Sequence, residues 1–328
     1  MPVDNKEIVI FFTGGTIEMA PREDVAGVVP GDHSGDLLCG LPPLPGVNLR
    51  PIKWSSLPSG HMTPERMLQL ARDIDTALAE ESVSGCVVLH GTDLLVESSF
   101  VLNMAVTSAK PVVTSGAMRH SGEIGYDGIR NLYDSLLACL AMPQDCEVLI
   151  QMGSQLFSAM DTVKTNSVSM TPMVGLVNGC VGDLVDGRVH FHKGVLGTRL
   201  RPPFAITDMS PFVPLIACWP GMDGTLIRAA LDAGAKALVV EGFGAGNIPP
   251  DAAEAVTDAL QKGVPVFLAS RCLRGGVWPI YGYPGGAAAL MQAGAFSAGQ
   301  MAATKLLLLV KAALGSGYPC DKLVRMLP

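Results

Sequence analysis

The chain has 328 residues, a formal net charge of −7, 16% charged residues and 48% hydrophobic ones. Typical globular domains carry about 25% charged residues, so this composition excludes a disordered or fibrous protein and favours an oligomer in which partner subunits cover apolar surface. The acidic balance argues against a nucleic-acid partner, and no apolar run approaches the roughly 18 residues that a membrane-spanning helix requires.

The first part of the chain alternates short apolar runs with helical patterns. Strands are expected over 8–12, 86–89, 111–114 and 148–151. Helices are expected from Pro64, with Thr63 as the N-cap, and over 96–108 and 128–141. This β-α-β-α order predicts an α/β fold in which a mostly parallel sheet carries helices on both faces.

The alternation of strands and helices resumes after a segment that does not show it. Residues 189–192 are typical of a short hairpin strand, and the basic, Pro-rich stretch 199–204 places a linker over 191–212. Further strands are expected over 213–217, 237–240 and 265–268, and helices over 224–233, 250–262 and 298–313. We therefore predict a larger N-terminal catalytic domain over 1–190, the linker, and a smaller C-terminal α/β domain over 213–328.

The cysteines and the N-terminus together predict a cytoplasmic location. None of the eight cysteines stands at C-x-x-C spacing, so neither a zinc site nor a redox pair is expected, and the thiols are expected to be reduced. The first residues carry both signs of charge and lead into a short apolar strand, without the cationic flank and longer apolar region of a signal peptide.

Hydroxyl side chains and glycines follow the first two strands. The segments Thr13–Thr16 and His90–Asp93 come where these strands end, and open parallel sheets bind ligands outside the carboxyl ends of their strands. A threonine becomes a nucleophile when a neighbouring base removes its proton. Lys164 is a candidate activator, and Asp93 could orient that lysine. The glycines leave backbone N–H groups free for a developing oxyanion.

Each of these features also has a simpler explanation. A Thr-Gly-Gly-Thr or His-Gly-Thr-Asp segment alone is typical of a tight strand-to-helix turn, and a single lysine is typical of a solvated surface. The combination is more informative, because two strand ends each carry a threonine flanked by glycine.

The sequence predicts no cofactor and no metal. Gly242, Gly244 and Gly246 are spaced GxGxG rather than GxGxxG, and no phosphate-binding GxxxxGK[ST] segment occurs. His190 and His192 face the same side of the expected hairpin strand and would suit a metal pair. No third ligand stands nearby in the sequence, which favours an exposed strand face.

Several motifs, in this order, resemble those of the bacterial-type L-asparaginase family, and the resemblance spans nearly the whole chain. Each motif alone is moderately specific, whereas their joint order is highly specific. The matching segments are Thr13–Ile17, Leu89–Asp93, Lys110–Val113, Gly116–Arg119, Tyr126–Gly128, Asn131–Tyr133, Lys164–Asn166 and Gly244–Asn247.

The resemblance implies an enzyme that cleaves a small carboxamide through a threonine acyl-enzyme, releasing ammonia without metal or cofactor. It implies a homo-oligomer, usually a tetramer built from close dimers. By position Thr16 would be the nucleophile, and Thr92, Asp93 and Lys164 would form a second triad in which Thr92 positions or activates water. The substrate-binding positions would be Gly15, Ser59, Gly60, Gly91, Thr92 and Asp93, with Ser59 at the α-carboxylate and Asp93 at the α-ammonium group.

Three positions depart from the family pattern. Val28 stands where the family often has a tyrosine that assists the nucleophile, and valine cannot transfer a proton. Gly60 replaces a substrate-holding amide side chain, and Leu94 replaces a threonine. Losing a polar partner of a buried charged ligand costs about 1–3 kcal/mol, so these changes favour a substrate other than free asparagine.

The main prediction is therefore an amidohydrolase acting on an asparagine-like amide. The first alternative is hydrolysis of a bulkier amide, a lactam or a peptide-like substrate. The second is a non-catalytic ligand-binding member of the same fold, favoured by the missing tyrosine and opposed by the presence of Thr16, Thr92, Asp93 and Lys164. A cofactor-dependent α/β enzyme is a third.

Overall fold

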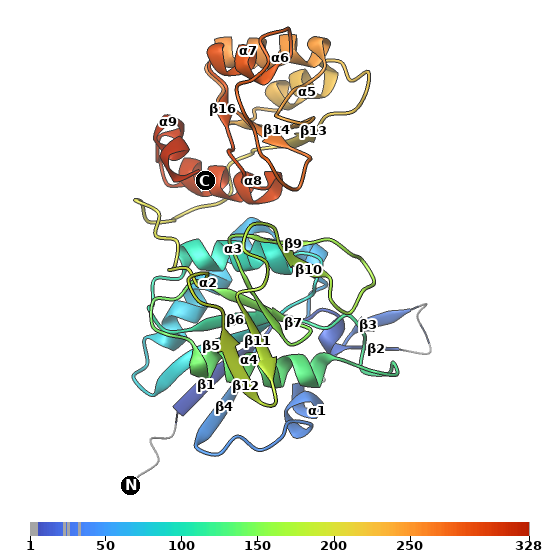
Figure 1. Cartoon of the computed structure of the whole chain (residues 1–328), viewed down its shortest axis with the longest axis vertical. Coiled ribbons are helices and arrows are strands. Elements are labelled where there is room, and N and C mark those ends of the chain that lie inside the picture. Colours follow the sequence, from blue (N-terminus) through green and yellow to red (C-terminus); the bar gives the residue numbers. More distant parts are fainter. Residues whose placement is uncertain (1–5, 22–23, 25–26, 32–33, 328) are drawn as a thin grey trace. The chain divides into compact units, whose positions relative to one another are not determined.

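The computed structural model describes residues 6–21, 24, 27–31 and 34–327. The chain divides into two compact units, residues 1–201 and residues 202–328 (Figure 1). Among the described residues, no helix combines the length and apolar character needed to cross a membrane.

Unit 1 is built on an eight-stranded sheet of order β12-β11-β8-β7-β6-β5-β1-β4. The strands β4, β1, β5, β6 and β7 run parallel, and β8, β11 and β12 continue the sheet in antiparallel fashion. The predicted fold class is therefore confirmed. The strands are β1 (Lys6–Phe12), β4 (Val47–Lys53), β5 (Val83–Leu89), β6 (Val112–Ser115), β7 (Leu149–Met152), β8 (Gln155–Ser158), β11 (Gly182–Val185) and β12 (Arg188–Phe191).

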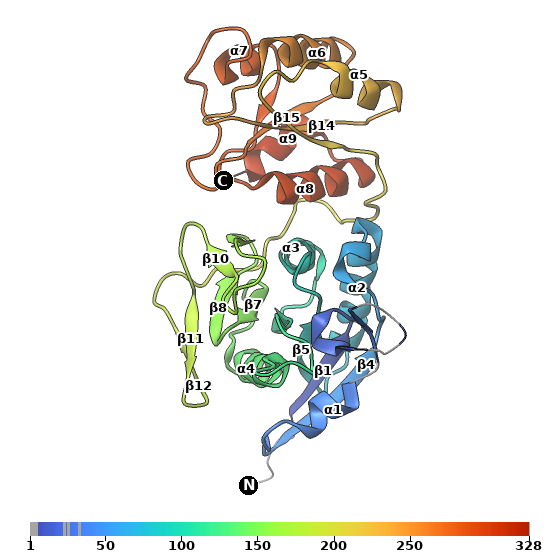
Figure 2. The same ribbon diagram turned by 90° about the vertical axis from the view of Figure 1, so that its right-hand side faces the viewer.

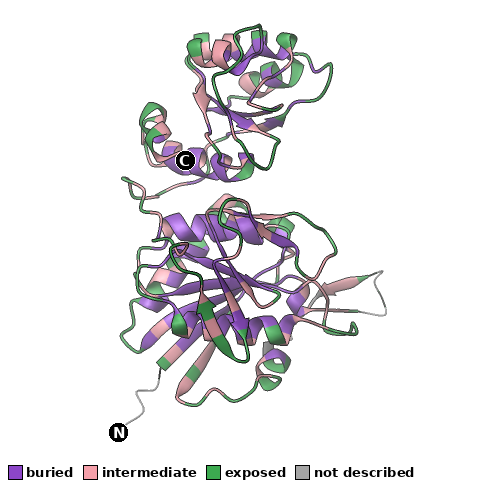
Figure 3. Ribbon diagram, in the orientation of Figure 1, coloured by how far each residue is buried: buried purple, intermediate pink, exposed green. Residues whose placement is uncertain are grey.

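Helices cover both faces of this sheet because its central strands are apolar on both sides (Figure 2). In β1, Ile8, Ile10 and Phe12 face a core that includes side chains of α1 and α4, whereas Val9 and Phe11 face α2 and α3. Figure 3 shows these central strands as buried along most of their length. The helices are α1 (Ser34–Cys39), α2 (Pro64–Leu78), α3 (Leu95–Ala105) and α4 (Gly128–Ala141).

Short antiparallel ribbons and 3-10 turns lie at the ends of strands of this sheet. Two antiparallel ribbons pair β2 (Met19–Pro21) with β3 (Val28–Pro30) and β9 (Thr162–Lys164) with β10 (Met173–Gly175). Single 3-10 turns, η1 (Thr16–Glu18) and η2 (Ser59–His61), follow β1 and β4.

Unit 2 is a smaller α/β layer structure with a four-stranded parallel sheet of order β13-β14-β15-β16. Its core joins apolar residues of β14 and β15 to α5 and α6. The elements are β13 (Leu215–Ala217), α5 (Thr225–Asp232), β14 (Leu238–Gly242), α6 (Pro250–Gln261), β15 (Val266–Ser270), α7 (Ala287–Gln292), β16 (Phe296–Ser297), α8 (Ala303–Gly315), α9 (Cys320–Leu323) and η3 (Val324–Met326).

Several boundaries differ from expectation, and three of the differences have local reasons. The helix expected to end at 108 ends at Ala105, because the Asp75 carboxylate accepts bonds from the backbone of Thr107 and Ser108. The helix expected from 298 begins at Ala303, since 298–301 form a turn after β16. The first part of the expected linker belongs to unit 1, where Arg199 donates to the carbonyl of Lys110 at 3.1 Å.

Candidate active site

Hydroxyl groups gather where the parallel strands β1 and β5 end. The chain passes from β1 to β4 on one side and returns to β5 on the other, so the β1/β5 boundary is the position where open sheets bind ligands. The backbone N–H and the side-chain hydroxyl of Thr13 both donate to the carbonyl oxygen of Leu89, at 3.0 and 2.9 Å. These bonds tie the loops that follow the two strands.

Glycines allow these loops to touch backbone to backbone. Gly15 has φ +88°, and a Cβ there would lie 2.3 Å from the Cα of Gly91. A Cβ on Gly91 would lie 2.7 Å from the hydroxyl oxygen of Ser59. Any side chain at Gly15 or Gly91 would push the loops apart. The contact therefore sets Thr16, Thr92 and Ser59 on three adjoining segments.

The segment after β4 carries Ser59 to this contact. The carbonyl oxygen of Thr13 accepts a bond from the Leu57 backbone N–H at 3.0 Å and one from the Ser55 hydroxyl at 2.6 Å. Ser59 is buried, whereas Gly60 is exposed, and a Cβ on Gly60 would meet no atom within 4 Å.

Lys164 reaches Thr92 and Asp93 from the β9–β10 ribbon. Its Nζ donates to the Thr92 hydroxyl at 3.0 Å and pairs with a carboxylate oxygen of Asp93 at 2.8 Å. Thr92 is buried, and the Lys164 side chain is 17% exposed, but that of Asp93 is 79% exposed. The arrangement joins an amine, a hydroxyl and an open carboxylate, which can move a proton and hold a cationic ligand.

Thr16 begins the turn η1 beside this cluster. It is half-buried, and its hydroxyl forms no hydrogen bond with another described residue. Because Gly15 meets Gly91, Thr16 and Thr92 are each one residue from the contact.

Two supporting residues were not among the predicted site residues, although Tyr126 lies in one of the matching motifs. The carboxylate of Glu18 is fully buried, accepts from the Gly14 N–H at 2.9 Å and pairs with Lys53 at 2.5 Å. The Tyr126 hydroxyl donates to the carbonyl of Ile17 at 2.6 Å, and burial raises its pKa well above the ordinary value. An acidic residue between the apolar Ile17 and Met19 was the available signal for Glu18, since a carboxylate in apolar surroundings needs partners.

His90 shapes the loop that carries Thr92. Its Nδ1–H donates to the carbonyl of Gly91 at 2.8 Å, which leaves Nε2 to accept from the Ser98 hydroxyl at 3.0 Å. Burial lowers the pKa of His90 to about 4. The ring is therefore neutral near pH 7, with the proton on Nδ1.

The remaining departures lie around the same loops. Val28 pairs with Pro21 in the β2–β3 ribbon and brings only hydrocarbon there. Leu94 is half-buried and stands at the N-cap of α3, where its side chain makes no capping bond.

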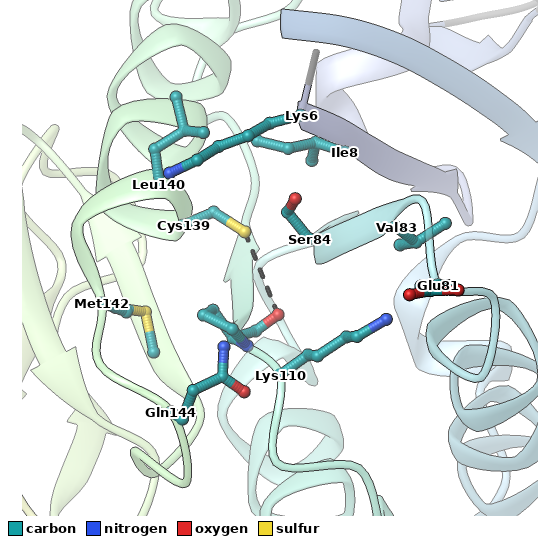
Figure 4. Close-up of a pocket in the computed structure, with 11 residues that line it drawn as sticks. Lys6, Ile8, Glu81, Val83, Ser84, Lys110, Cys139, Leu140, Met142 and Gln144 are labelled. Carbon is teal, nitrogen blue, oxygen red and sulfur yellow. Dashed lines mark hydrogen bonds between the residues drawn. The ribbon is translucent and has the colours of Figure 1, made fainter. Parts of the chain in front are cut away.

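Two other features are candidate ligand positions. A pocket of about 300 Å³ opens at the amino ends of β1 and β5, lined by Lys6, Lys110 and Cys139 among others (Figure 4). In unit 2, the Asn247 side chain accepts from the backbone N–H of Ala287 at 3.2 Å and so ties its turn to the start of α7.

Comparisons with known proteins agree along nearly the whole chain. Residues 7–196 match the family described as "Asparaginase, N-terminal", and residues 212–327 match "Glutaminase/Asparaginase C-terminal domain". A "Probable L-asparaginase" of Deinococcus radiodurans is 34% identical over 324 residues, covering 96% of each chain. An "L-asparaginase" of Bacillus licheniformis is 27% identical over 86% of this chain and 87% of its own. Among solved structures, a "Probable Cytoplasmic L-asparaginase" of Campylobacter jejuni has a TM-score of 0.85, with 28% identity and 98% of each chain covered.

Proposed function

Because this chain belongs to the asparaginase family and is an amidohydrolase acting on a linear amide, we propose that it hydrolyses the side-chain amide of L-asparagine to L-aspartate and ammonia. The observation that carries the proposal is the cluster of Lys164, Thr92 and Asp93 beside the Gly15–Gly91 contact. A purely binding protein has no need for an amine aligned on a buried hydroxyl.

The proposed reaction has two halves. The Thr16 hydroxyl attacks the amide carbon and loses its proton toward Thr92 and Lys164, and the C–N bond breaks as the nitrogen takes up a proton and leaves as ammonia. Water then attacks the acyl-enzyme, giving its proton to the same relay, and the product carboxylate leaves as the Thr16 hydroxyl is restored. Backbone N–H groups of the glycine loops stabilise the oxyanion in both halves.

Substrate recognition uses the groups that surround the cluster. Asp93, largely exposed and negative, is suited to an α-ammonium group. Ser59 lies against Gly91 and supplies a hydroxyl for the α-carboxylate. The absence of a tyrosine at Val28 is consistent with a nucleophile that relies on the Lys164 relay for proton transfer.

A bulkier amide is the second candidate, and one observation favours it. The free space around Gly60 leaves room for substrate atoms where an amide side chain would otherwise stand. The variant Gly60→Asn introduces that side chain without steric conflict. If Gly60 widens the pocket, this variant shifts the ratio of kcat/KM values toward free asparagine and away from N-substituted amides.

The decisive experiment measures ammonia release from asparagine, glutamine and a panel of larger amides. Thr16→Ala should abolish release, whereas the matched control Thr76→Ala, on the outer face of α2, should retain it. Release from asparagine by Thr16→Ala at the wild-type rate would overturn the nucleophile assignment. Release only from a larger amide would replace asparagine by the second candidate.

We also propose a cytoplasmic homo-oligomer, a tetramer by analogy with the family. The eight free thiols are the form that reducing compartments maintain, and large apolar side chains such as Trp278 and Ile280 are at least half exposed in the isolated chain. Light scattering at the monomer mass would contradict the assembly.

A further inference from the structure

A thiol, a carboxylate and an imidazole meet on the edge of the sheet in unit 1. Cys180 precedes β11, Asp183 lies within it, and His192 follows β12. The Cys180 sulfur, an Asp183 oxygen and a His192 ring nitrogen all lie within 4.8 Å of one another. His192 thus has the neighbours that were not visible near it in the sequence.

The two ring nitrogens of His192 both face hydrogen-bond acceptors. Nδ1 lies 3.0 Å from the carbonyl oxygen of Cys180, and Nε2 lies 2.7 Å from an Asp183 carboxylate oxygen. A neutral ring has only one N–H, so one contact needs a second proton or a cation. Metal-binding histidines usually bind the ion through one ring nitrogen and donate the other ring N–H to a backbone carbonyl or a carboxylate.

Neighbouring groups hold the other two side chains in place. The Gln155 amide nitrogen lies 3.5 Å from the Cys180 sulfur and 3.3 Å from an Asp183 oxygen. Asp183 is fixed between two strands, paired with Gln155 on β8 and with His190 on β12. The β11–β12 turn, Asp186-Gly187, has positive φ at both residues and closes a two-residue hairpin. Asp183 on a paired strand, with Cys180 and His192 next to the ends of β11 and β12, gives the site a defined geometry.

We propose that Cys180, Asp183 and His192 form a binding site for a borderline divalent transition-metal ion such as Zn²⁺. Sulfur, imidazole nitrogen and carboxylate oxygen are the three donors that Zn²⁺ takes from proteins. On binding, the S–H bond of Cys180 breaks, its proton passes to solvent and a sulfur–metal bond forms. Water or His190, which stands opposite Asp183 in the strand register, completes the coordination.

The contacts do not favour a nucleophilic cysteine. The Cys180 thiol points at an Asp183 oxygen at 4.0 Å, and both His192 nitrogens have other partners. No imidazole nitrogen is therefore aligned on the sulfur among the described residues. The ion would instead join the segment after β10 to the β11–β12 hairpin and stabilise unit 1, independently of the amidase site.

Titration calorimetry on metal-free, reduced full-length protein tests the site directly. With Zn²⁺ we expect one ion per chain and a higher Tm. Removing a group that hydrogen-bonds to a metal ligand typically weakens metal binding about 10–100-fold. Cys180→Ser, Asp183→Asn and His192→Gln each remove a ligand itself, so each should weaken Zn²⁺ binding by about 100-fold or more. The control variants Cys39→Ser and Cys272→Ser, which remove exposed thiols elsewhere, should bind as the wild type does.

Cobalt supplies a second readout that is independent of stability. Co²⁺ bound to the wild type should show a thiolate-to-metal charge-transfer band, and Cys180→Ser should lack it. Circular dichroism and retained amidase activity identify variants that are folded. Equal Zn²⁺ affinity in the wild type and in Cys180→Ser/His192→Gln, or no stoichiometric binding at micromolar Zn²⁺, would overturn the proposal and leave an Asp183–His192 ion pair only.

Discussion

The variant Lys164→Met separates proton transfer from structural support. Methionine keeps an unbranched side chain of similar length but removes the amine that bonds to Thr92 and pairs with Asp93. The fold should tolerate the change. An ion pair with a partner 79% exposed contributes about 0–1 kcal/mol, and the hydroxyl bond adds about 1 kcal/mol.

The expected catalytic loss is larger than this structural cost. Positioned general acid–base groups contribute about 10²–10⁴-fold to rate, which corresponds to about 3–5 kcal/mol of transition-state stabilisation. If Lys164 drives proton transfer, kcat should fall by this factor while the free energy of unfolding falls by at most about 2 kcal/mol.

Coupled ammonia assays and denaturant unfolding measure the two quantities on the same preparation. The control Lys110→Met removes a half-buried lysine whose Nζ donates to the Glu80 carbonyl at 2.7 Å, and it should keep full activity. A Lys164→Met enzyme with unchanged kcat would refute the relay. A fall in the rate of Lys164→Met that is fully accounted for by its unfolded fraction would also refute the relay.

Three further outcomes follow from the supporting residues. Gly15→Ala places a side chain at a positive φ that disfavours it and makes that side chain clash with Gly91. The variant should be destabilised by about 3 kcal/mol or more and should release no ammonia. A stable, active variant would exclude the contact between the Gly15 and Gly91 loops. Glu18→Gln keeps the acceptor for the Gly14 N–H but loses the ion pair with Lys53, whose side chain is 32% exposed. Chemical denaturation should show a loss of about 1–2 kcal/mol in the unfolding free energy, and an unchanged unfolding free energy would contradict a stabilising ion pair. The pKa of His90 is about 4 in the folded protein and 6.5 in the unfolded chain, so the unfolded chain binds the proton first as pH falls. The unfolding free energy should therefore drop by about 3 kcal/mol between pH 6.5 and pH 4. The variant His90→Asn should reduce this dependence of the unfolding free energy on pH.

The parallel part of the sheet could be predicted because its signals are local. The helix α4 has the bounds 128–141 that its apolar spacing indicates, and Thr63 caps α2 through a bond from the Arg66 N–H. The antiparallel part was largely missed. Its strands β8 and β11 have only four residues each, which is too short for a clear alternation of side chains.

The candidate site, too, could be predicted only where its signals are local in the sequence. Strand-end motifs indicated the segments at Thr16 and Thr92, because every parallel strand delivers its carboxyl end to one edge. The partnership of Glu18 with Lys53 could not be foreseen, since it depends on how the loop after β1 lies against β4. The cluster at Cys180 was hidden for a related reason: a hairpin brings His192 back beside residues twelve and nine positions earlier.

The long-range bond between Lys164 and Thr92 also has a consequence for refolding. Its partners are 72 residues apart, and Thr16 lies still earlier in the chain, so the proposed amidase centre is assembled from most of unit 1. Contacts between distant residues form late, because the loop between them must close first. Recovered activity is therefore a reporter of completed folding in unit 1, and it should lag behind the return of helical signal after dilution from denaturant.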